Sequence, residues 1–273
     1  MLKKFSTLLV ICSAFLPTLS SAGNYSIGVE GFRDTYHESD LDLEIKSDFG
    51  SITANYTTQG RKAFFGLDGR MSYGTNDYES PSGKLSGVPQ WEFELRGRFG
   101  LTTPLWGGSF SPYTGVGMRY FRDEGKGYYT DTGNVAYDRR IFQAYIPIGA
   151  SLSYITDDGW HITPQAEADL MFYGNVNSRL TNVGIVNIPG VGPGQYNDPA
   201  YNRQTWGLGA RGELMFGKSS GNYSWQVGPF IRYWWVPESD VDVYSVTGSS
   251  TLVGVLEPEN DRTQVGVAAR LIW

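Results

Sequence analysis

The stretch that decides the fold is Trp91-Glu92-Phe93-Glu94-Leu95-Arg96-Gly97-Arg98-Phe99-Gly100-Leu101. Apolar residues or glycine occupy its odd positions, and the even positions carry two glutamates, two arginines and a glycine. Because successive side chains of an extended chain point to opposite sides, this segment predicts a strand with one apolar and one charged face. Residues Trp160–Phe172 and Trp206–Phe216 repeat the pattern. The fold is therefore expected to be all-β.

Alternation alone does not separate a soluble sandwich from a membrane barrel, but strand length and tryptophan position do. Runs of about ten alternating residues match a tilted membrane strand. Trp225 and Trp235 share a face ten positions apart. At about 3.3 Å per residue and a tilt near 40°, they are separated by about 25 Å along the barrel axis, the height of an apolar membrane band. Tryptophans at segment ends predict two aromatic girdles, formed by Trp91, Trp160, Trp206, Trp225, Trp235 and Trp273.

The same test finds about ten segments, separated by alternately short and long connections. This predicts a transmembrane antiparallel up-and-down β-barrel with both termini on one side. The long connections are Arg33–Asp48, Gly74–Gln90, Arg122–Ile141, Gly174–Thr205 and Val236–Asp261. Within the last, Val241–Val246 and Thr251–Leu256 are each too short to cross a bilayer, and we expect a hairpin above the membrane. The segments are Tyr25–Phe32, Phe49–Thr57, Ala63–Tyr73, Trp91–Leu101, Tyr113–Phe121, Phe142–Tyr154, Trp160–Phe172, Trp206–Phe216, Tyr223–Trp235 and Arg262–Trp273, and the pattern of the second slips between Phe49 and Ile52.

Composition excludes several other classes of protein. The 273 residues include 8 Trp, 18 Tyr and 14 Phe, too many aromatic residues for a disordered chain. The net charge of −6 argues against nucleic acid as a partner. Residues 1–22 carry two lysines, an apolar core and Ser20-Ser21-Ala22, which predicts a signal peptide cleaved after Ala22. Residues 23–273 would then form one domain with no cysteine, because Cys12 lies in the signal.

Together with the final segment, which ends Val265-Gly266-Val267-Ala268-Ala269-Arg270-Leu271-Ile272-Trp273, these features resemble a bacterial outer-membrane β-barrel protein. The resemblance implies export to the cell outer membrane, short turns in the periplasm and long loops outside. It also implies contact with lipid and lipopolysaccharide, and recognition of the terminal aromatic residue by the barrel-insertion machinery. The physical reason for closure is independent, since an open sheet edge would leave unpaired N–H and C=O groups in lipid.

The strand count is also similar to that of the omptin proteases, which place an Asp pair and a His-Asp pair on their outer loops. This sequence departs from that pattern: Gly174–Thr205 contains no histidine, and Gly74–Gln90 offers Asp77 and Glu79. His37, beside Glu38 and Asp40 and with Asp77, is either a general base or a solvated loop histidine. His161 has lumen parity at the periplasmic end of its segment. We therefore assign no catalytic residue, metal or cofactor.

Parity instead directs attention to the lumen, where it places seven acids and eight arginines. So many charges in a narrow barrel must be paired or hydrated. Barrels of about eight strands are filled by side chains and open channels need about sixteen, so two interpretations remain: an ion-paired plug, or a narrow path for solutes or ions. The predicted network comprises Glu30, Asp68, Arg70, Glu92, Glu94, Arg96, Arg98, Arg119, Glu167, Asp169, Arg211, Glu213, Arg232, Arg262 and Arg270.

A filled lumen would leave function to the loops, which are acidic and rich in tyrosine. Glu38, Asp123 and Glu257 are among the loop acids, which form either a recognition surface or a charged, wetted rim. The fourth loop carries Val183, Ile185 and Ile188, and is expected to fold over the mouth or bind an apolar partner. The leading hypothesis is a structural, binding or adhesion protein of the cell surface with an unidentified extracellular ligand. The alternatives are a narrow porin-like channel for small solutes or ions, and an omptin-like or lipid-modifying surface hydrolase.

Overall fold

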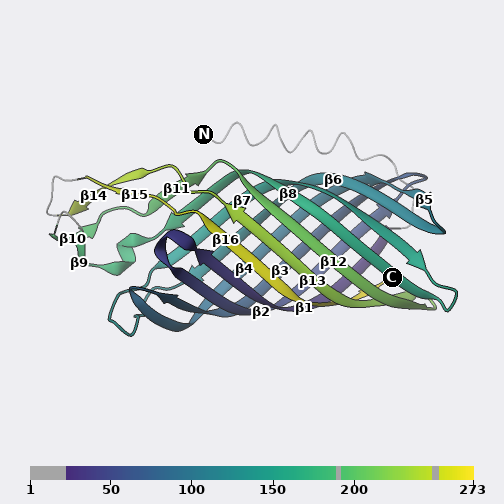
Figure 1. Cartoon of the computed structure of the whole chain (residues 1–273), viewed down its shortest axis with the longest axis horizontal. Coiled ribbons are helices and arrows are strands. Elements are labelled where there is room, and N and C mark those ends of the chain that lie inside the picture. Colours follow the sequence, from purple (N-terminus) through teal and green to yellow (C-terminus); the bar gives the residue numbers. More distant parts are fainter. Residues whose placement is uncertain (1–22, 189–191, 248–251) are drawn as a thin grey trace.

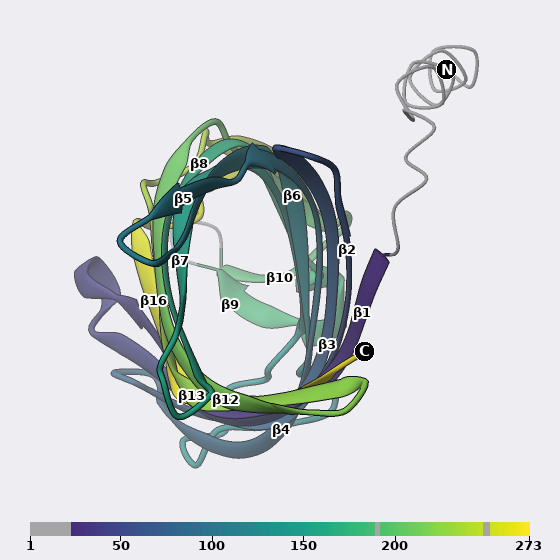
Figure 2. The ribbon, with the colours of Figure 1, turned by 90° about the vertical axis from the view of Figure 1, so that its right-hand side faces the viewer.

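Ten long strands form a closed antiparallel barrel in the computed structural model, which describes residues 23–188, 192–247 and 252–273 (Figures 1 and 2). The prediction of a ten-stranded up-and-down barrel is confirmed, whereas the predicted signal peptide lies outside the described residues. No helix in the described part of the chain is long and apolar enough to span a bilayer. The barrel strands are β1 (Gly23–Glu38), β2 (Leu43–Gln59), β3 (Ala63–Ser80), β4 (Gly83–Leu101), β6 (Gly108–Glu124), β7 (Asp138–Ile155), β8 (Trp160–Ser178), β12 (Gly207–Ser220), β13 (Tyr223–Val236) and β16 (Asn260–Ile272).

The barrel closes where β16 pairs with β1 over twelve residues, from Ser26↔Ile272 to His37↔Asp261. Every other barrel strand pairs with its neighbours in chain order. Two short strands extend the sheet: β5 (Thr103–Leu105) pairs with the start of β6, and β11 (Ala200–Gln204) pairs with the end of β8. All barrel strands therefore have partners on both sides, as a bilayer requires.

The first two outer connections are much shorter than the sequence predicted, because the strands continue. Residues 39–42, with the 3-10 helix η2 (Ser39–Leu41), join β1 to β2, and residues 81–82 join β3 to β4. A strand of 19 residues such as β4 rises roughly 45 Å along the axis, against about 25 Å for the apolar band. The barrel wall therefore stands well above the membrane on the loop side.

The fourth and fifth outer connections form a second sheet. The predicted hairpin is present as β14 (Asp242–Thr247) and β15 (Leu252–Val255), although Thr251 lies outside the described residues. It does not stand alone, because β10 (Gly192–Tyr196) pairs with β14, and β9 (Val186–Ile188) pairs with β10. The short helix η3 (Leu180–Val183) precedes them. In Figure 2, β9 and β10 lie across the barrel axis, and in Figure 1 they lie at the end opposite Trp273.

The outer surface of the barrel is apolar between two belts of aromatic rings. Val29 and Ile52, between the belts, are 59% and 62% exposed, as expected of side chains that face lipid. On the loop side, Trp206 lies against Trp235 and Tyr73 against Trp91, at centroid distances of 5.0 and 4.6 Å. At the other end, Trp160 and Trp225 are 5.7 Å apart, and Trp273 and Tyr25 are 6.4 Å apart.

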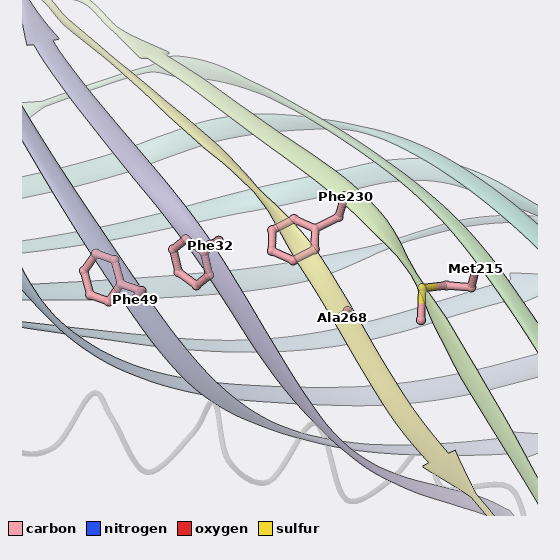
Figure 3. Close-up of a cluster of buried hydrophobic side chains, with 5 residues drawn as sticks. All are labelled: Phe32, Phe49, Met215, Phe230 and Ala268. Carbon is pink, nitrogen blue, oxygen red and sulfur yellow. The ribbon is translucent and has the colours of Figure 1, made fainter.

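A small apolar cluster lies inside the barrel, formed by Phe32, Phe49, Met215, Phe230 and Ala268 (Figure 3). Phe49 is 4% exposed, whereas Ile52 of the same strand faces outward. The apparent slip in the second predicted segment is therefore an inward-facing phenylalanine in a regular strand.

Candidate functional site

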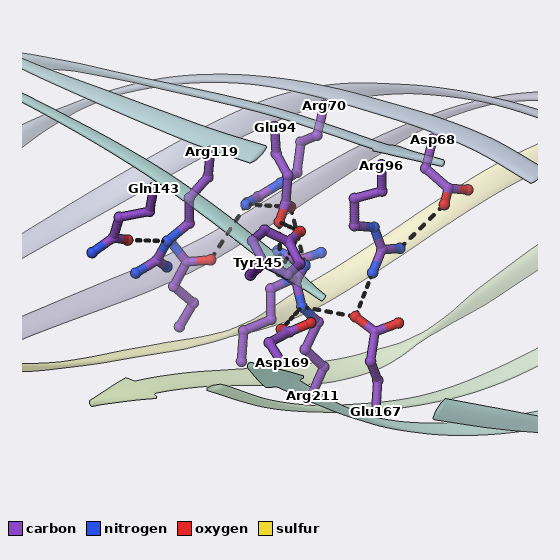
Figure 4. A network of polar contacts seen from close by, with 12 residues as sticks. Asp68, Arg70, Glu94, Arg96, Arg119, Gln143, Tyr145, Glu167, Asp169 and Arg211 are labelled. Carbon is purple, nitrogen blue, oxygen red and sulfur yellow. Dashed lines mark hydrogen bonds and ion pairs between the residues drawn. The ribbon is translucent and has the colours of Figure 1, made fainter. Parts of the chain in front are cut away.

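The centre of the lumen is occupied by an ion network around Glu94 of β4 (Figure 4). Its carboxylate accepts hydrogen bonds from Arg211 at 2.5 Å, from Arg70 at 3.1 Å and from the hydroxyl of Tyr145 at 2.5 Å. Arg211 also donates to Asp169 at 2.6 Å. These side chains come from β3, β4, β7, β8 and β12, so one cluster joins strands around much of the ring.

Several of these contacts cross the lumen rather than following its wall. On the shorter way round the barrel, β4 and β12 are separated by β6, β7 and β8, yet Glu94 and Arg211 are in direct contact. Gln264 of β16 likewise donates to Glu92 of β4 at 3.0 Å. Side chains from opposite walls therefore meet and bridge the lumen at this level.

The remaining predicted network residues also lie inside the barrel. Arg119 makes its hydrogen bond to Gln143 at 2.5 Å, and its guanidinium carbon lies 3.8 Å from the centroid of the Trp234 ring. The ion pairs are Arg70–Glu92 (2.6 Å), Arg96–Glu167 (2.7 Å), Arg96–Asp68 (3.4 Å), Arg98–Asp68 (2.5 Å), Arg232–Glu30 (2.7 Å), Arg262–Asp34 (3.6 Å) and Arg270–Glu213.

Sequence reasoning missed the neutral members of this network. Tyr145, Gln143 and Gln264 are buried and form hydrogen bonds with charged side chains. They were not predicted, because only acidic residues and arginines were assigned to the lumen from the sequence. Parity along β16 would have placed Gln264 inside with Arg262 and Arg270. Trp234 is also internal, packed against Tyr145 at 5.0 Å, and belongs to neither girdle.

Two cavities lie on either side of the network. The one nearer the chain termini has a volume of about 410 Å³ and a polar, charged lining that includes Asn55, Arg98, Glu213 and Gln226. The other, at the loop end, has a volume of about 460 Å³ and is lined by aliphatic side chains, including Leu43, Ile45, Leu85 and Val88, together with polar and charged ones. We call this second cavity the outer chamber. It lies inside the wall that β1 to β4 extend above the membrane.

A polar group borders the outer chamber. Tyr36 donates to Glu38 at 2.5 Å and accepts from Arg139 at 2.9 Å, and Arg139 also pairs with Glu257. Tyr36 and Glu38 follow Arg33 on β1, toward the loop end of the barrel. The outward-facing ion pair of Arg33 with Asp48 marks the end of the apolar band on this strand. Burial raises the pKa of the Tyr36 phenol above its ordinary range, against the attraction of Arg139. The phenol is thus a stable hydrogen-bond donor.

The loop acids are not all exposed, as a wetted rim would require. Glu38, Asp123 and Glu257 are 4%, 8% and 6% exposed and all border the outer chamber. Asp123 lies on β6 beyond Arg122, which faces outward and pairs with Glu124. Burial raises the pKa of the Asp123 carboxyl, although Arg139 and Arg262 attract its charged form.

The structure places His37 and Glu38 on opposite faces of β1. Glu38 points into the barrel, whereas His37, the preceding residue of β1, is half-exposed with its Nδ1 3.6 Å from an oxygen of Asp261. His161 lies at the start of β8, with its Nε2 3.0 Å from the Ser219 hydroxyl. Among the described residues, no group of three or more His, Cys, Asp or Glu side chains is arranged to hold a metal ion.

Comparison with known proteins gives a fold but no family. No family model matches the chain, and no curated protein matches it. Among solved structures, the outer membrane protease OmpT from Escherichia coli is 10% identical with a TM-score of 0.56, covering 94% of this chain and 97% of OmpT. The translocator domain of the autotransporter NalP from Neisseria meningitidis is 10% identical with a TM-score of 0.43, covering 97% and 94%. The β domain of the Bordetella autotransporter BrkA is 13% identical with a TM-score of 0.41, covering 92% and 99%.

At 10% identity, the likeness to OmpT shows a shared fold and nothing of activity. The closed antiparallel sheet, the apolar outer band and this likeness agree with one another. The chain has the fold of a bacterial outer-membrane β-barrel, with ten strands as in the omptin-like architecture.

Proposed function

We propose that this chain is a surface-binding protein of the bacterial outer membrane, in which a plugged barrel holds an outer chamber above the bilayer. The apolar band would contact lipid and lipopolysaccharide, and Trp273 would be read by the insertion machinery. Recognition would occur at the loop end, where the long strands form a rigid wall around the chamber.

One observation carries the proposal: Glu94 of β4 is bonded to Arg211 of β12 across the lumen, within a network that also holds Arg70 and Asp169. An ion crossing this level would have to separate buried charge pairs, and breaking such a pair costs about 3–5 kcal/mol. This free-energy barrier opposes the passage of ions through the barrel and favours a structural or binding role.

Conductance in planar lipid bilayers tests the proposal directly. The purified wild-type barrel is expected to give no steady current above background. The triple variant Arg70→Ala, Glu94→Ala, Arg211→Ala serves as the positive control, because removal of three large side chains from the same level should open a conducting path. A wild-type current as large as that of the triple variant would overturn the proposal.

A narrow channel is the second candidate, because the polar cavity near the termini would form part of a path for ions through the barrel. Under this alternative the wild-type protein would conduct, and charge-reversing substitutions such as Arg98→Glu would change its ion selectivity. We propose no protease activity by analogy with OmpT, because the sequence departs from the omptin pattern of catalytic residues, and His37 and Glu38 lie on opposite faces of β1.

A further inference from the structure

The outer chamber has the size and lining of a small-molecule site. Its volume of about 460 Å³ falls within the range of about 300–1,000 Å³ typical of ligand pockets. Ile45 and Val88 form part of its wall and are only 8% and 3% exposed, so the apolar surface is inside the barrel and not on its lipid-facing exterior. A ligand with an apolar body of moderate size would replace water against this wall.

The charges that border the chamber do not balance. Three carboxylates, those of Glu38, Asp123 and Glu257, face one guanidinium, that of Arg139. Arg139 is already engaged, since it pairs with Glu257, lies 3.7 Å from Glu38 and donates to Tyr36. Acidic side chains therefore outnumber basic ones among the residues that line the chamber, although Arg262, which does not line it, also attracts the charged form of Asp123.

The Asp123 carboxylate is only partly matched by donors, although Gln90, Arg139 and Arg262 favour its charged form. Its Oδ1 atom is buried and has no hydrogen-bond partner in the described structure. A buried carboxylate oxygen left unpaired is costly, and a charged N–H donor is its strongest partner. Asp123 lines the chamber and is 8% exposed, so the charged nitrogen of a ligand inside the chamber can approach its carboxylate.

From these contacts we infer that the outer chamber binds a small amphipathic amine. Its aliphatic or aromatic body would pack against Leu43, Ile45, Leu85 and Val88, and its protonated nitrogen would donate to Asp123. A primary amine suits this position better than a quaternary ammonium, because the latter has no N–H to donate. This inference rests on the proposed function, which makes the chamber the recognition site.

Calorimetric titration of the full barrel in lipid nanodiscs tests the inference with three matched probes. These are 4-phenylbutylamine, 4-phenylbutan-1-ol and 4-phenylbutanoate, with empty nanodiscs used to subtract partitioning into lipid. The amine is expected to bind at least about tenfold more tightly than the alcohol, and the carboxylate more weakly than both, because only the amine supplies a charged donor.

Two variants locate the binding. Asp123→Asn is expected to weaken amine binding about tenfold or more and to leave alcohol binding unchanged. Asp48→Asn removes the same charge from the outer surface of β2 and should leave both affinities unchanged; unboiled gel mobility would verify that each variant is folded. Equal affinities for amine and alcohol, no binding by either, or full amine binding by Asp123→Asn would overturn the inference. The proposed function fails separately, through conductance of the wild-type barrel.

Discussion

Glu94 shows how the lumen tolerates so many charges. It is 5% exposed, and its two oxygens accept from two arginines and one tyrosine. Arginine suits this role because its planar fork presents several donors at fixed angles, so one guanidinium can hold two carboxylates. Arg211 does so with Glu94 and Asp169. The network is therefore built from shared partners, and removal of one member leaves others buried and incompletely paired.

We predict that Glu94→Gln lowers the free energy of unfolding by about 3 kcal/mol, because Arg70 and Arg211 lose the charge of a buried partner. The value is at the lower end for a broken buried pair, since both arginines keep other carboxylates. Urea titration in phospholipid vesicles, followed by tryptophan fluorescence, measures it. Asp48→Asn, at an exposed pair, should leave the transition unchanged. A loss below about 1 kcal/mol for Glu94→Gln would indicate a hydrated network.

Asp123 predicts a pH dependence of the opposite sign to that of a salt-bridged carboxylate. Burial raises its pKa in the folded barrel, so as pH rises above about 3.9 the unfolded chain loses this proton first. Wild-type stability should therefore fall, relative to Asp123→Asn, as pH rises from the ordinary aspartate pKa to the raised one. Urea unfolding of both proteins at about pH 3 and about pH 7 tests this. A wild-type advantage that grows with pH would contradict it.

The strands extend further than their sequence pattern reveals, for a physical reason. Within the bilayer one face meets lipid and the other the lumen, so apolar and charged residues alternate and all ten segments were predictable. Above the bilayer the outer face meets water. In β1, Arg33, Thr35 and His37 face outward while Asp34, Tyr36 and Glu38 face inward, so polarity no longer separates the faces. The outer chamber was missed for this reason, although its acids were recognised.

We predict that the upper part of the β3–β4 hairpin is dispensable for insertion and required for the outer chamber. Asn76 and Val88 are directly paired, so residues 77–87 can be replaced by Asn-Gly, a favoured two-residue turn. The shortened protein should fold into lipid vesicles and keep its heat-dependent gel mobility, because both girdles and the network remain. It should lose amine binding, since Leu85 is removed. Failure to insert would show that the upper wall takes part in barrel formation.

The whole molecule is polarised along its axis. A polar cavity lies at the end that holds Tyr25 and Ile272, the ion network lies between the girdles, and the outer chamber lies at the end with the long connections. Tight turns and termini at one end with long connections at the other match barrels inserted from the periplasm. We therefore expect the chamber to face the cell exterior, where a ligand from outside would reach it.

Cysteine labelling would establish that orientation. Cys12, the one cysteine of the sequence, lies in the predicted signal peptide, so a chain cleaved after Ala22 would have no native thiol to interfere. We predict that Ser82→Cys, at the tip of the β3–β4 hairpin, reacts with a membrane-impermeant maleimide on intact cells. Asp158→Cys, in the β7–β8 turn, should react only after the outer membrane is permeabilised. Both positions are exposed, so a difference in labelling reports the side of the membrane and not burial. Labelling of Asp158→Cys alone on intact cells would reverse the orientation and place the chamber in the periplasm.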